Sequence, residues 1–268
     1  MKLPFVPAII ALEATIAHGA AAEDKPFVDR PLALAILHMS ADAGIGFGQY
    51  EGIDAAGHST GNRVGWGTNL EGAIGLPFVG EFGARFGYRF NDTGSFAQAD
   101  HFARLFDPIV NEPGFDAFTN PELYLRGTLF DLTIVQVGLE TRAIIPSAQG
   151  SYFALTPGVP VRIHVPKVAR IDTGLYLPIS FDPDTTYSIQ VPAQLFFQVS
   201  DAFFGPLTGL RYTHHGGDPQ PEIVAGLGGG YTLSQVLDLK IQVYTSQIND
   251  VNWSKHIGGG LGAGLRLP

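Results

Sequence analysis

The residues from Gly80 to Phe90 alternate strictly between polar or small and apolar side chains. One parity holds Glu81, Gly83, Arg85, Gly87 and Arg89, and the other holds Phe82, Ala84, Phe86, Tyr88 and Phe90. Successive side chains of a β-strand point to opposite faces, so the pattern predicts a strand with one charged and one apolar face. A soluble sheet over a core and a transmembrane barrel in lipid both produce it. How often the pattern recurs, and how its turns are arranged, separates the two classes.

The alternation recurs along the chain and predicts twelve strands. They lie at residues 32–50, 62–76, 80–90, 121–130, 132–145, 158–165, 168–181, 186–200, 203–213, 221–232, 235–247 and 256–267. Ser40-Ala41-Asp42 could break the first run into a hairpin, but one long strand places both chain ends on the same side. We therefore expect an even-numbered antiparallel sheet.

The connections between these strands alternate between short and long. Short turns are expected at 77–79, 130–131, 166–167, 200–201 and 233–234, and longer segments at 52–61, 91–120, 146–157, 182–185, 214–219 and 246–254. An up-and-down transmembrane barrel has short turns at one rim and extended loops at the other. The connections of a soluble β-sandwich, the alternative fold, need not sort in this way. The fold class predicted is all-β, a single closed antiparallel barrel.

Residues 1–22 are expected to form an export signal. Lys2 is followed by the largely apolar stretch 3–17 and then by Ala20-Ala21-Ala22, small residues that suit cleavage before Glu23. The apolar stretch is too short for a membrane-spanning helix. An apolar N-terminal core helix is the alternative. Residues 23–268 would then form one outer-membrane barrel domain.

The composition excludes several classes of protein. The chain has no cysteine, so disulfides and thiolate metal sites are impossible. Its net charge of −9 argues against a nucleic-acid partner. Outside the signal there is no run of about 18 apolar residues, so a position in a membrane would require strands.

The polar parity of each strand is expected to face the barrel interior, because a charge facing lipid at mid-depth costs about 2–4 kcal/mol. This places inside the acidic residues Glu81, Glu122, Glu140, Asp172, Glu222 and Asp238, and the basic residues Arg85, Arg89, Arg126, Arg142, Arg162, Arg211, Lys240 and Arg266. The residues predicted to line a pore are Glu81, Arg85, Arg89, Glu122, Arg126, Glu140, Arg142, Asp172 and Lys240. Two interpretations remain: a ladder of ion pairs that nearly fills the interior, or a water-filled path that prefers anions. Arg85, Arg89 and Arg126 are the candidates for setting that preference.

Glycines cluster around 226–230 and 258–264. A phosphate-binding loop would need a following helix and usually a Lys-Ser/Thr pair, and neither is present. We expect these glycines to permit curvature or the close approach of other side chains inside the barrel.

Taken together, the export signal, the alternating strands, the sorted turns and the absence of cysteine resemble a Gram-negative bacterial outer-membrane β-barrel over residues 31–268. Residues 99–107 and 205–209 are also similar to poorly characterised outer-membrane proteins of myxobacterial type. The resemblance implies outer-membrane lipid, the barrel-assembly machinery and small solutes as partners. Such barrels commonly end on an aromatic residue, whereas this chain ends on Pro268, which puts efficient insertion in doubt.

The leading functional hypothesis is a porin-like, non-enzymatic pore without a cofactor. A plugged or loop-displaying barrel is an alternative, because the segment 91–120, with a short helix expected at 97–106, could close the mouth. A membrane hydrolase is another, but His38 and Ser40 on one strand face lack an evident third catalytic member.

The remaining histidines favour no particular chemistry. His214 and His215 with Asp218 could bind a metal, but adjacent side chains point apart, so a solvated loop is the preferred interpretation. His164, beside Arg162, is expected to be a satisfied interior residue rather than a base.

Overall fold

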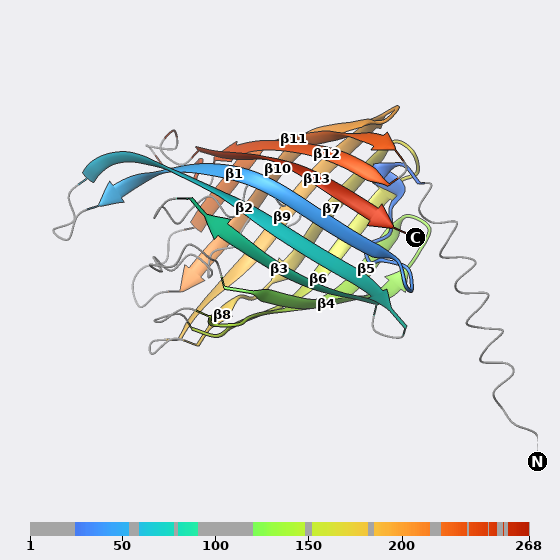
Figure 1. The fold of residues 1–268 in the computed structure, drawn as a ribbon, viewed down its shortest axis with the longest axis horizontal. Coiled ribbons are helices and arrows are strands. Elements are labelled where there is room, and N and C mark those ends of the chain that lie inside the picture. Colours follow the sequence, from blue (N-terminus) through green and yellow to red (C-terminus); the bar gives the residue numbers. More distant parts are fainter. Residues whose placement is uncertain are drawn as a thin grey trace, which may run out of the picture.

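The structure is a computed structural model. It describes residues 25–53, 59–77, 80–90, 120–147, 152–181, 185–214, 221–234, 236–245, 247–250, 254 and 257–267. These residues form a closed antiparallel barrel with twelve strand positions (Figure 1). The predicted fold class is therefore confirmed. None of the described residues belongs to a helix long and apolar enough to cross a membrane.

The strands follow one another around the barrel in chain order. They are β1 (Met39–Ile53), β2 (Ser59–Leu76), β3 (Gly80–Arg89), β4 (Glu122–Asp131), β5 (Val135–Ile144), β6 (Ala154–Val165), β7 (Ala169–Tyr176), β8 (Ile179–Ser180), β9 (Thr186–Val199), β10 (Ala202–His214), β11 (Pro221–Ser234), β12 (Leu237–Thr245) and β13 (Ile257–Leu267). The short β8 shares one position with β7, because both pair with β6 and β9. The ring closes where β1 pairs with β13. Closure gives the strands hydrogen-bonded neighbours on both sides, as spanning hydrocarbon requires.

The short connections lie at one rim of the barrel and the longer ones at the other, as predicted. Those at the rim shared by the C-terminus and residues 25–38 are short, at 77–79, 132–134, 166–168, 200–201 and 235–236. Those at the other rim are 54–58, 90–121, 145–153, 181–185, 215–220 and 246–256. Two predicted turns are displaced, since residues 130–131 are the last of β4 and residues 233–234 are the last of β11. The helix expected at 97–106 lies outside the described residues.

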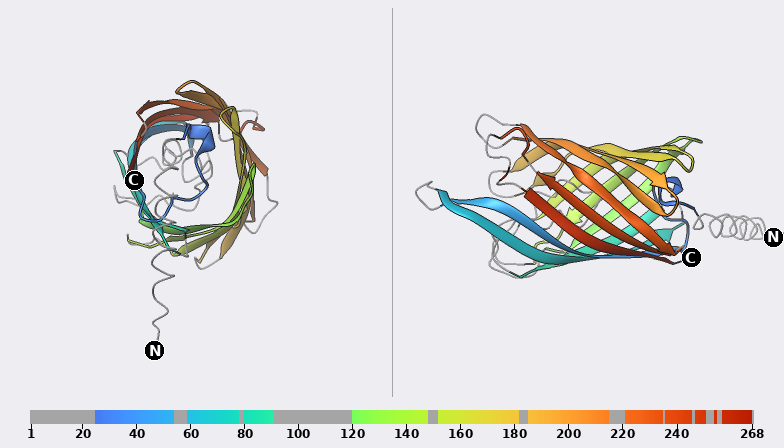
Figure 2. Two further views of the ribbon diagram at one scale, coloured as in Figure 1. Left: turned by 90° about the vertical axis from the view of Figure 1, so that its right-hand side faces the viewer. Right: turned by 90° about the horizontal axis from the view of Figure 1, so that it is seen from above.

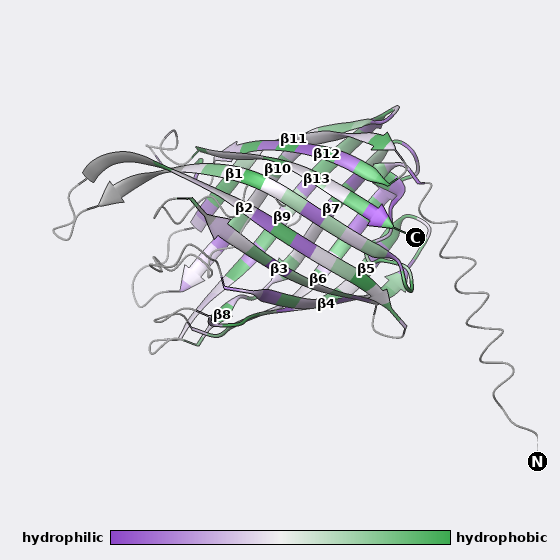
Figure 3. Cartoon of the chain, in the orientation of Figure 1, coloured by the Kyte–Doolittle hydropathy of each residue, from purple (hydrophilic) through white to green (hydrophobic). Residues whose placement is uncertain are grey.

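Polar and apolar side chains are sorted in the opposite way to a soluble protein. In β3, Phe82 and Phe86 are 37% and 49% exposed, whereas Glu81 and Arg85 are each 6% exposed. The same alternation of apolar and polar residues recurs along the strands of the wall (Figure 3). The exposed apolar side chains form the surface that suits lipid, and the charged side chains are enclosed by the wall.

The first predicted strand is wrong at its N-terminal end. Residues 32–38 do not belong to the wall, because β1 begins at Met39. The chain from residue 25 to residue 38 instead lies inside the ring, beginning with the 3₁₀ turn η1 (Phe27–Asp29), as Figure 2 shows in blue. We call residues 25–38 the lumen segment. The other predicted strands agree with the structure to within four residues at each end, except that the strand predicted at 168–181 is divided into β7 and β8.

A left-handed residue marks the point at which the chain joins the wall. Leu37 has φ 66°, and its N–H donates to the Gly75 carbonyl at 2.8 Å. Gly75 in turn donates to the His38 carbonyl at 2.8 Å. The apolar run before this point has the composition of a strand, which explains why the sequence pattern extended β1 too far.

Candidate lumen site

An aromatic cluster anchors the start of the lumen segment to the wall. The Phe27 ring stacks on Phe203 of β10 with a centroid distance of 3.6 Å and meets Phe196 of β9 edge-on at 5.4 Å. All three side chains are at most 4% exposed. The guanidinium of Arg170 lies 4.0 Å from the centroid of the Phe27 ring, a distance typical of a cation–π contact.

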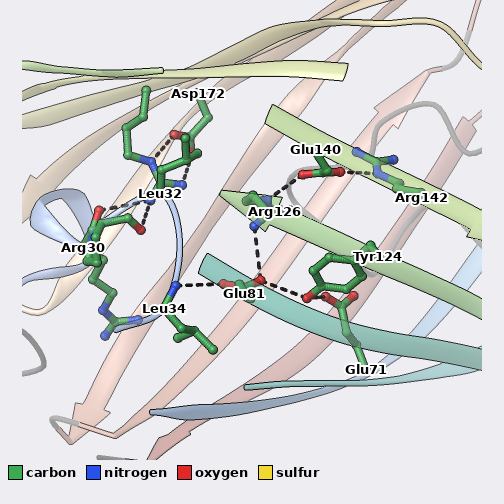
Figure 4. A network of polar contacts seen from close by, with 12 residues as sticks. Arg30, Leu32, Leu34, Glu71, Glu81, Tyr124, Arg126, Glu140, Arg142 and Asp172 are labelled. Atoms are coloured by element: carbon green, nitrogen blue, oxygen red, sulfur yellow. Dashed lines mark hydrogen bonds and ion pairs between the residues drawn. The ribbon is translucent and has the colours of Figure 1, made fainter. Parts of the chain in front are cut away.

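Side chains of the wall accept hydrogen bonds from the backbone of the lumen segment. Leu32 N–H donates to Gln136 Oε1 and Leu34 N–H donates to Glu81 Oε2, each at 2.9 Å. Figure 4 shows the second of these contacts, with Leu34 beside Glu81. A buried backbone donor must be paired, and here the strands supply acceptors in place of a β-ladder.

Two arginines of the wall donate to carbonyl groups of the same segment. Arg170 Nη1 donates to Phe27 O at 2.6 Å. Arg162 Nη1 donates to Arg30 O at 3.0 Å and to Pro31 O at 2.5 Å. The segment is therefore held through its backbone, at acceptors that do not depend on the identity of its side chains.

One ion pair ties the segment to β12. Arg30 binds both carboxylate oxygens of Asp238 in β12, and both side chains are at most 7% exposed. Thr232 Oγ1 donates to the same carboxylate at 2.9 Å. Arg266 of β13 is more distant, with its Nε 4.0 Å from Asp238.

A first group of charged residues lies between β3 and β5 (Figure 4). Arg126 Nε lies 2.5 Å from Glu140 Oε2, and its Nη1 lies 3.5 Å from Glu81 Oε1. Arg142 pairs with the other oxygen of Glu140. The Tyr124 hydroxyl lies 3.0 Å from the same oxygen of Glu81. Each carboxylate thus contacts more than one donor.

A second group lies between β6 and β7, where Asp172 is shared by two arginines. Arg162 Nε donates to Asp172 Oδ1 at 2.6 Å, and Arg170 Nε lies 2.9 Å from Oδ2. Further pairs join Lys240 to Asp42 and Arg211 to Glu222. Ion pairs between inward-facing side chains therefore recur among the described residues.

Two cavities flank the lumen segment. The inner one has a volume of about 130 Å³, and the other, of about 910 Å³, lies toward β4 and β5. Pro31 and the stretch 33–35 line both cavities, so the lumen segment lies between them. The basic residues around the inner cavity are Arg30, Arg126, Arg162, Arg170, Lys240 and Arg266, and the acidic residues are Asp42, Glu71, Glu81 and Asp172.

The structure brings some of the sequence-predicted residues to the cavities. Those lining the inner cavity are Glu81, Arg126, Asp172 and Lys240, and Glu140 lines the other. Those buried in the wall but lining neither cavity are Arg85, Glu122 and Arg142. Arg89 belongs to β3, but its side chain lies outside the described part of the chain. That these residues line a conducting pore stays a prediction.

Sequence reasoning missed several residues of the cavity. Arg170, Asp42 and Glu71 share the inward parity of their strands, so the same rule applied to every strand would have found them. Strand parity could not have identified Arg30, because this residue precedes the first strand of the wall and its position depends on the path of the lumen segment. Gln194 has the inward parity, but it is uncharged and was not among the residues predicted to line a pore.

His38 and Ser40 both line the inner cavity, as does Asp42 two residues further on. The carboxylate of Asp42 pairs with Lys240, however, and this pairing does not favour a catalytic triad with His38 and Ser40. His215 and Asp218 lie outside the described residues. Over the part of the chain that is described, no three His, Cys, Asp or Glu residues gather closely enough to hold a metal ion.

Comparison with known proteins gives matches in structure only. No protein-family model and no curated protein matches the chain. An outer membrane channel from Pseudomonas putida F1 is similar with a TM-score of 0.59 and 9% identity, over 88% of this chain and 97% of that one. The KdgM porin matches with a TM-score of 0.52 and 8% identity, over 83% of this chain and 98% of that one. At such identities the likeness concerns the fold, and the predicted resemblance is confirmed at that level: this chain has the fold of bacterial outer-membrane β-barrels.

Proposed function

We propose that this protein is a narrow, porin-like passage of the bacterial outer membrane that favours small anionic solutes. The observation that carries the proposal is the lining of the inner cavity, where six basic side chains face four acidic ones. The chain as a whole has a net charge of −9, so the basic excess is confined to the lining of this cavity. Basic side chains around a pore favour the entry of anions.

The lumen segment supports a narrow passage. The same few residues of this segment, Pro31 and 33–35, line the cavities on both of its sides. Solutes that move through the barrel would pass between this segment and the charged wall. The proposal therefore concerns small ions and metabolites, not large substrates.

The reversal potential of the refolded protein in a planar bilayer under a KCl gradient tests the charge preference. We expect a shift toward the chloride equilibrium potential. Lys240→Gln removes one cation from the cavity lining and should move the reversal potential toward zero. Lys167→Gln, in the exposed turn between β6 and β7, is the matched control and should leave it unchanged. A cation-shifted wild-type potential would refute the proposal.

A sealed barrel that displays its outer loops is the second candidate. It is favoured by the lumen segment, which runs inside the ring and is fixed by the Arg30–Asp238 pair and by Phe27. An inserted protein that gives no current would support this candidate over the pore. The export signal at residues 1–22, the barrel domain at 23–268 and the part played by the assembly machinery stay predictions, because residues 1–24 and Pro268 lie outside the described residues.

A further inference from the structure

Gln194 of β9 differs from Gln136 and Gln190, two other buried glutamines of the wall, whose amides form hydrogen bonds. It is 3% exposed and lines the inner cavity. Within the described residues, neither its amide nitrogen nor its amide oxygen has a hydrogen-bond partner. Gln136, by contrast, accepts from Leu32 N–H and donates to Asp131. A buried amide without partners is unfavourable, so its polar atoms have unused capacity to bind a ligand in the cavity.

The same cavity contains a cation that the wall neutralises only in part. Arg266 makes no hydrogen bond through Nε to any described residue, and its nearest carboxylate, Asp238, is 4.0 Å away. That carboxylate is already bound by Arg30 through two nitrogens and by Thr232. Arg266 is therefore available to a negatively charged group.

A similar surplus exists on the other side of the cavity. Arg162 and Arg170 share the single carboxylate of Asp172. The guanidinium carbons of Arg30 and Arg170 lie 5.6 Å and 4.0 Å from the centroid of the same ring, that of Phe27, which brings these like charges together. A bound anion would relieve this repulsion, because it would add negative charge where four guanidinium groups share two carboxylates.

We infer that the inner cavity is a binding site for a small organic anion that carries a hydroxyl beside its carboxylate. The guanidinium groups of Arg266 and Arg170 would bind the carboxylate, and the Gln194 amide would pair with the hydroxyl. A cavity of about 130 Å³ holds the equivalent of roughly four waters, which sets the size of the ligand. The inference rests on the proposed function only for the route by which the anion enters.

Titration calorimetry on the refolded full-length protein in detergent at low ionic strength tests the site, with glycolate as the probe. Acetate lacks the hydroxyl and glycolamide lacks the charge. Glycolate should bind about tenfold more tightly than acetate, and glycolamide should not bind. Gln194→Leu should abolish the preference for glycolate over acetate, whereas Arg266→Gln should weaken both about tenfold or more.

Gln190→Leu is the matched control, because Gln190 is a buried glutamine of the same strand that lies outside the cavity lining. It should bind glycolate as the wild type does. Gln194→Glu is a second variant, whose added charge should prevent anion binding. Heat-modifiable migration on a gel would show that each variant is folded. Equal binding of glycolate and glycolamide, or wild-type affinity in both Gln194 variants, would overturn the inference.

The outcomes also separate the site from the pore. Glycolate binding by a protein that gives no current would uphold the site and refute the proposed passage. An anion-selective current from a protein that does not bind glycolate would refute the site and leave the passage standing.

Discussion

At the scale of single residues, Glu140 shows how the interior carries charge. Its side chain is fully buried and pairs with Arg126 of β4 through one oxygen and with Arg142 of its own strand through the other. A buried carboxylate is tolerated only when its charge and its hydrogen-bonding capacity are both satisfied. Its two partners come from β4 and β5, so Glu140 links these neighbouring strands of the wall.

Glu140→Gln should destabilise the barrel markedly. The change leaves two buried guanidinium groups with less compensating charge, for which the expected loss is about 3–5 kcal/mol. Glu222→Gln is the matched control, because that side chain is 24% exposed and its pair with Arg211 is better solvated. Its expected loss is below about 1 kcal/mol. Urea unfolding of the refolded variants, followed by tryptophan fluorescence, compares the two, and equal losses would contradict the account.

Inward tyrosines lie over glycines of neighbouring strands. Tyr124 faces Gly83 and Tyr176 faces Gly158 in the β-ladder, and a Cβ atom added to either glycine would overlap the tyrosine ring. Tyr244 faces Gly258 in the same way, with its ring 2.9 Å from the position of an added Cβ atom. In the glycine cluster around residues 226–230, the expected close approach of a side chain is seen at Gly230, where an added Cβ atom would lie 2.4 Å from the Phe203 ring.

Gly83→Ala should cost about 1–3 kcal/mol, because the new methyl group forces the Tyr124 ring away from the wall. Gly72→Ala is the matched control, since a Cβ there would make only an ordinary contact of 3.9 Å with Ser40 O. The same unfolding measurement applies to both. A Gly83→Ala protein as stable as the Gly72→Ala protein would show that the ring is not confined.

At the scale of elements, the lumen segment behaves differently from the strands around it. Its backbone donors bind Gln136 and Glu81 rather than a neighbouring strand. Besides these backbone contacts, two of its own side chains attach it to the wall, Phe27 and Arg30. A segment held in this way can be loosened without loss of the closed β-ladder.

Phe27→Ala should enlarge the passage. The change removes the stacking on Phe203 and the edge contact with Phe196, so the start of the segment loses its anchor. We expect single-channel conductance several-fold above that of the wild type, with the barrel still folded. Leu37→Ala is the matched control, because that side chain is 56% exposed. Unchanged conductance in Phe27→Ala would mean that the segment does not limit the current.

At the scale of the whole molecule, the sequence predicts the wall well and the interior poorly. A closed barrel imposes a two-residue period and an alternation of short and long turns, and both are visible in residues such as those of β3. The lumen segment follows neither rule. Its apolar residues satisfy the strand pattern at 32–38, although their backbone groups bind side chains of distant strands. Contacts such as Arg30 with Asp238, 208 positions apart, depend on closure of the whole ring.

The sequence predicted that charged side chains would face one another inside the barrel, but it did not predict which residues would pair. Parity placed Arg126, Glu140 and Asp172 on the charged side, but it did not indicate that each carboxylate would be shared by two arginines. Which residues border a cavity depends on the path of the lumen segment, and local sequence does not encode that path.

Single-channel recording of the wild-type protein in a planar bilayer tests the central claim, that solutes pass through this barrel beside the lumen segment. The account predicts discrete, small conductance steps from folded, inserted protein. Folded and inserted protein that never gives a step would contradict it, and would mean that the segment seals the lumen.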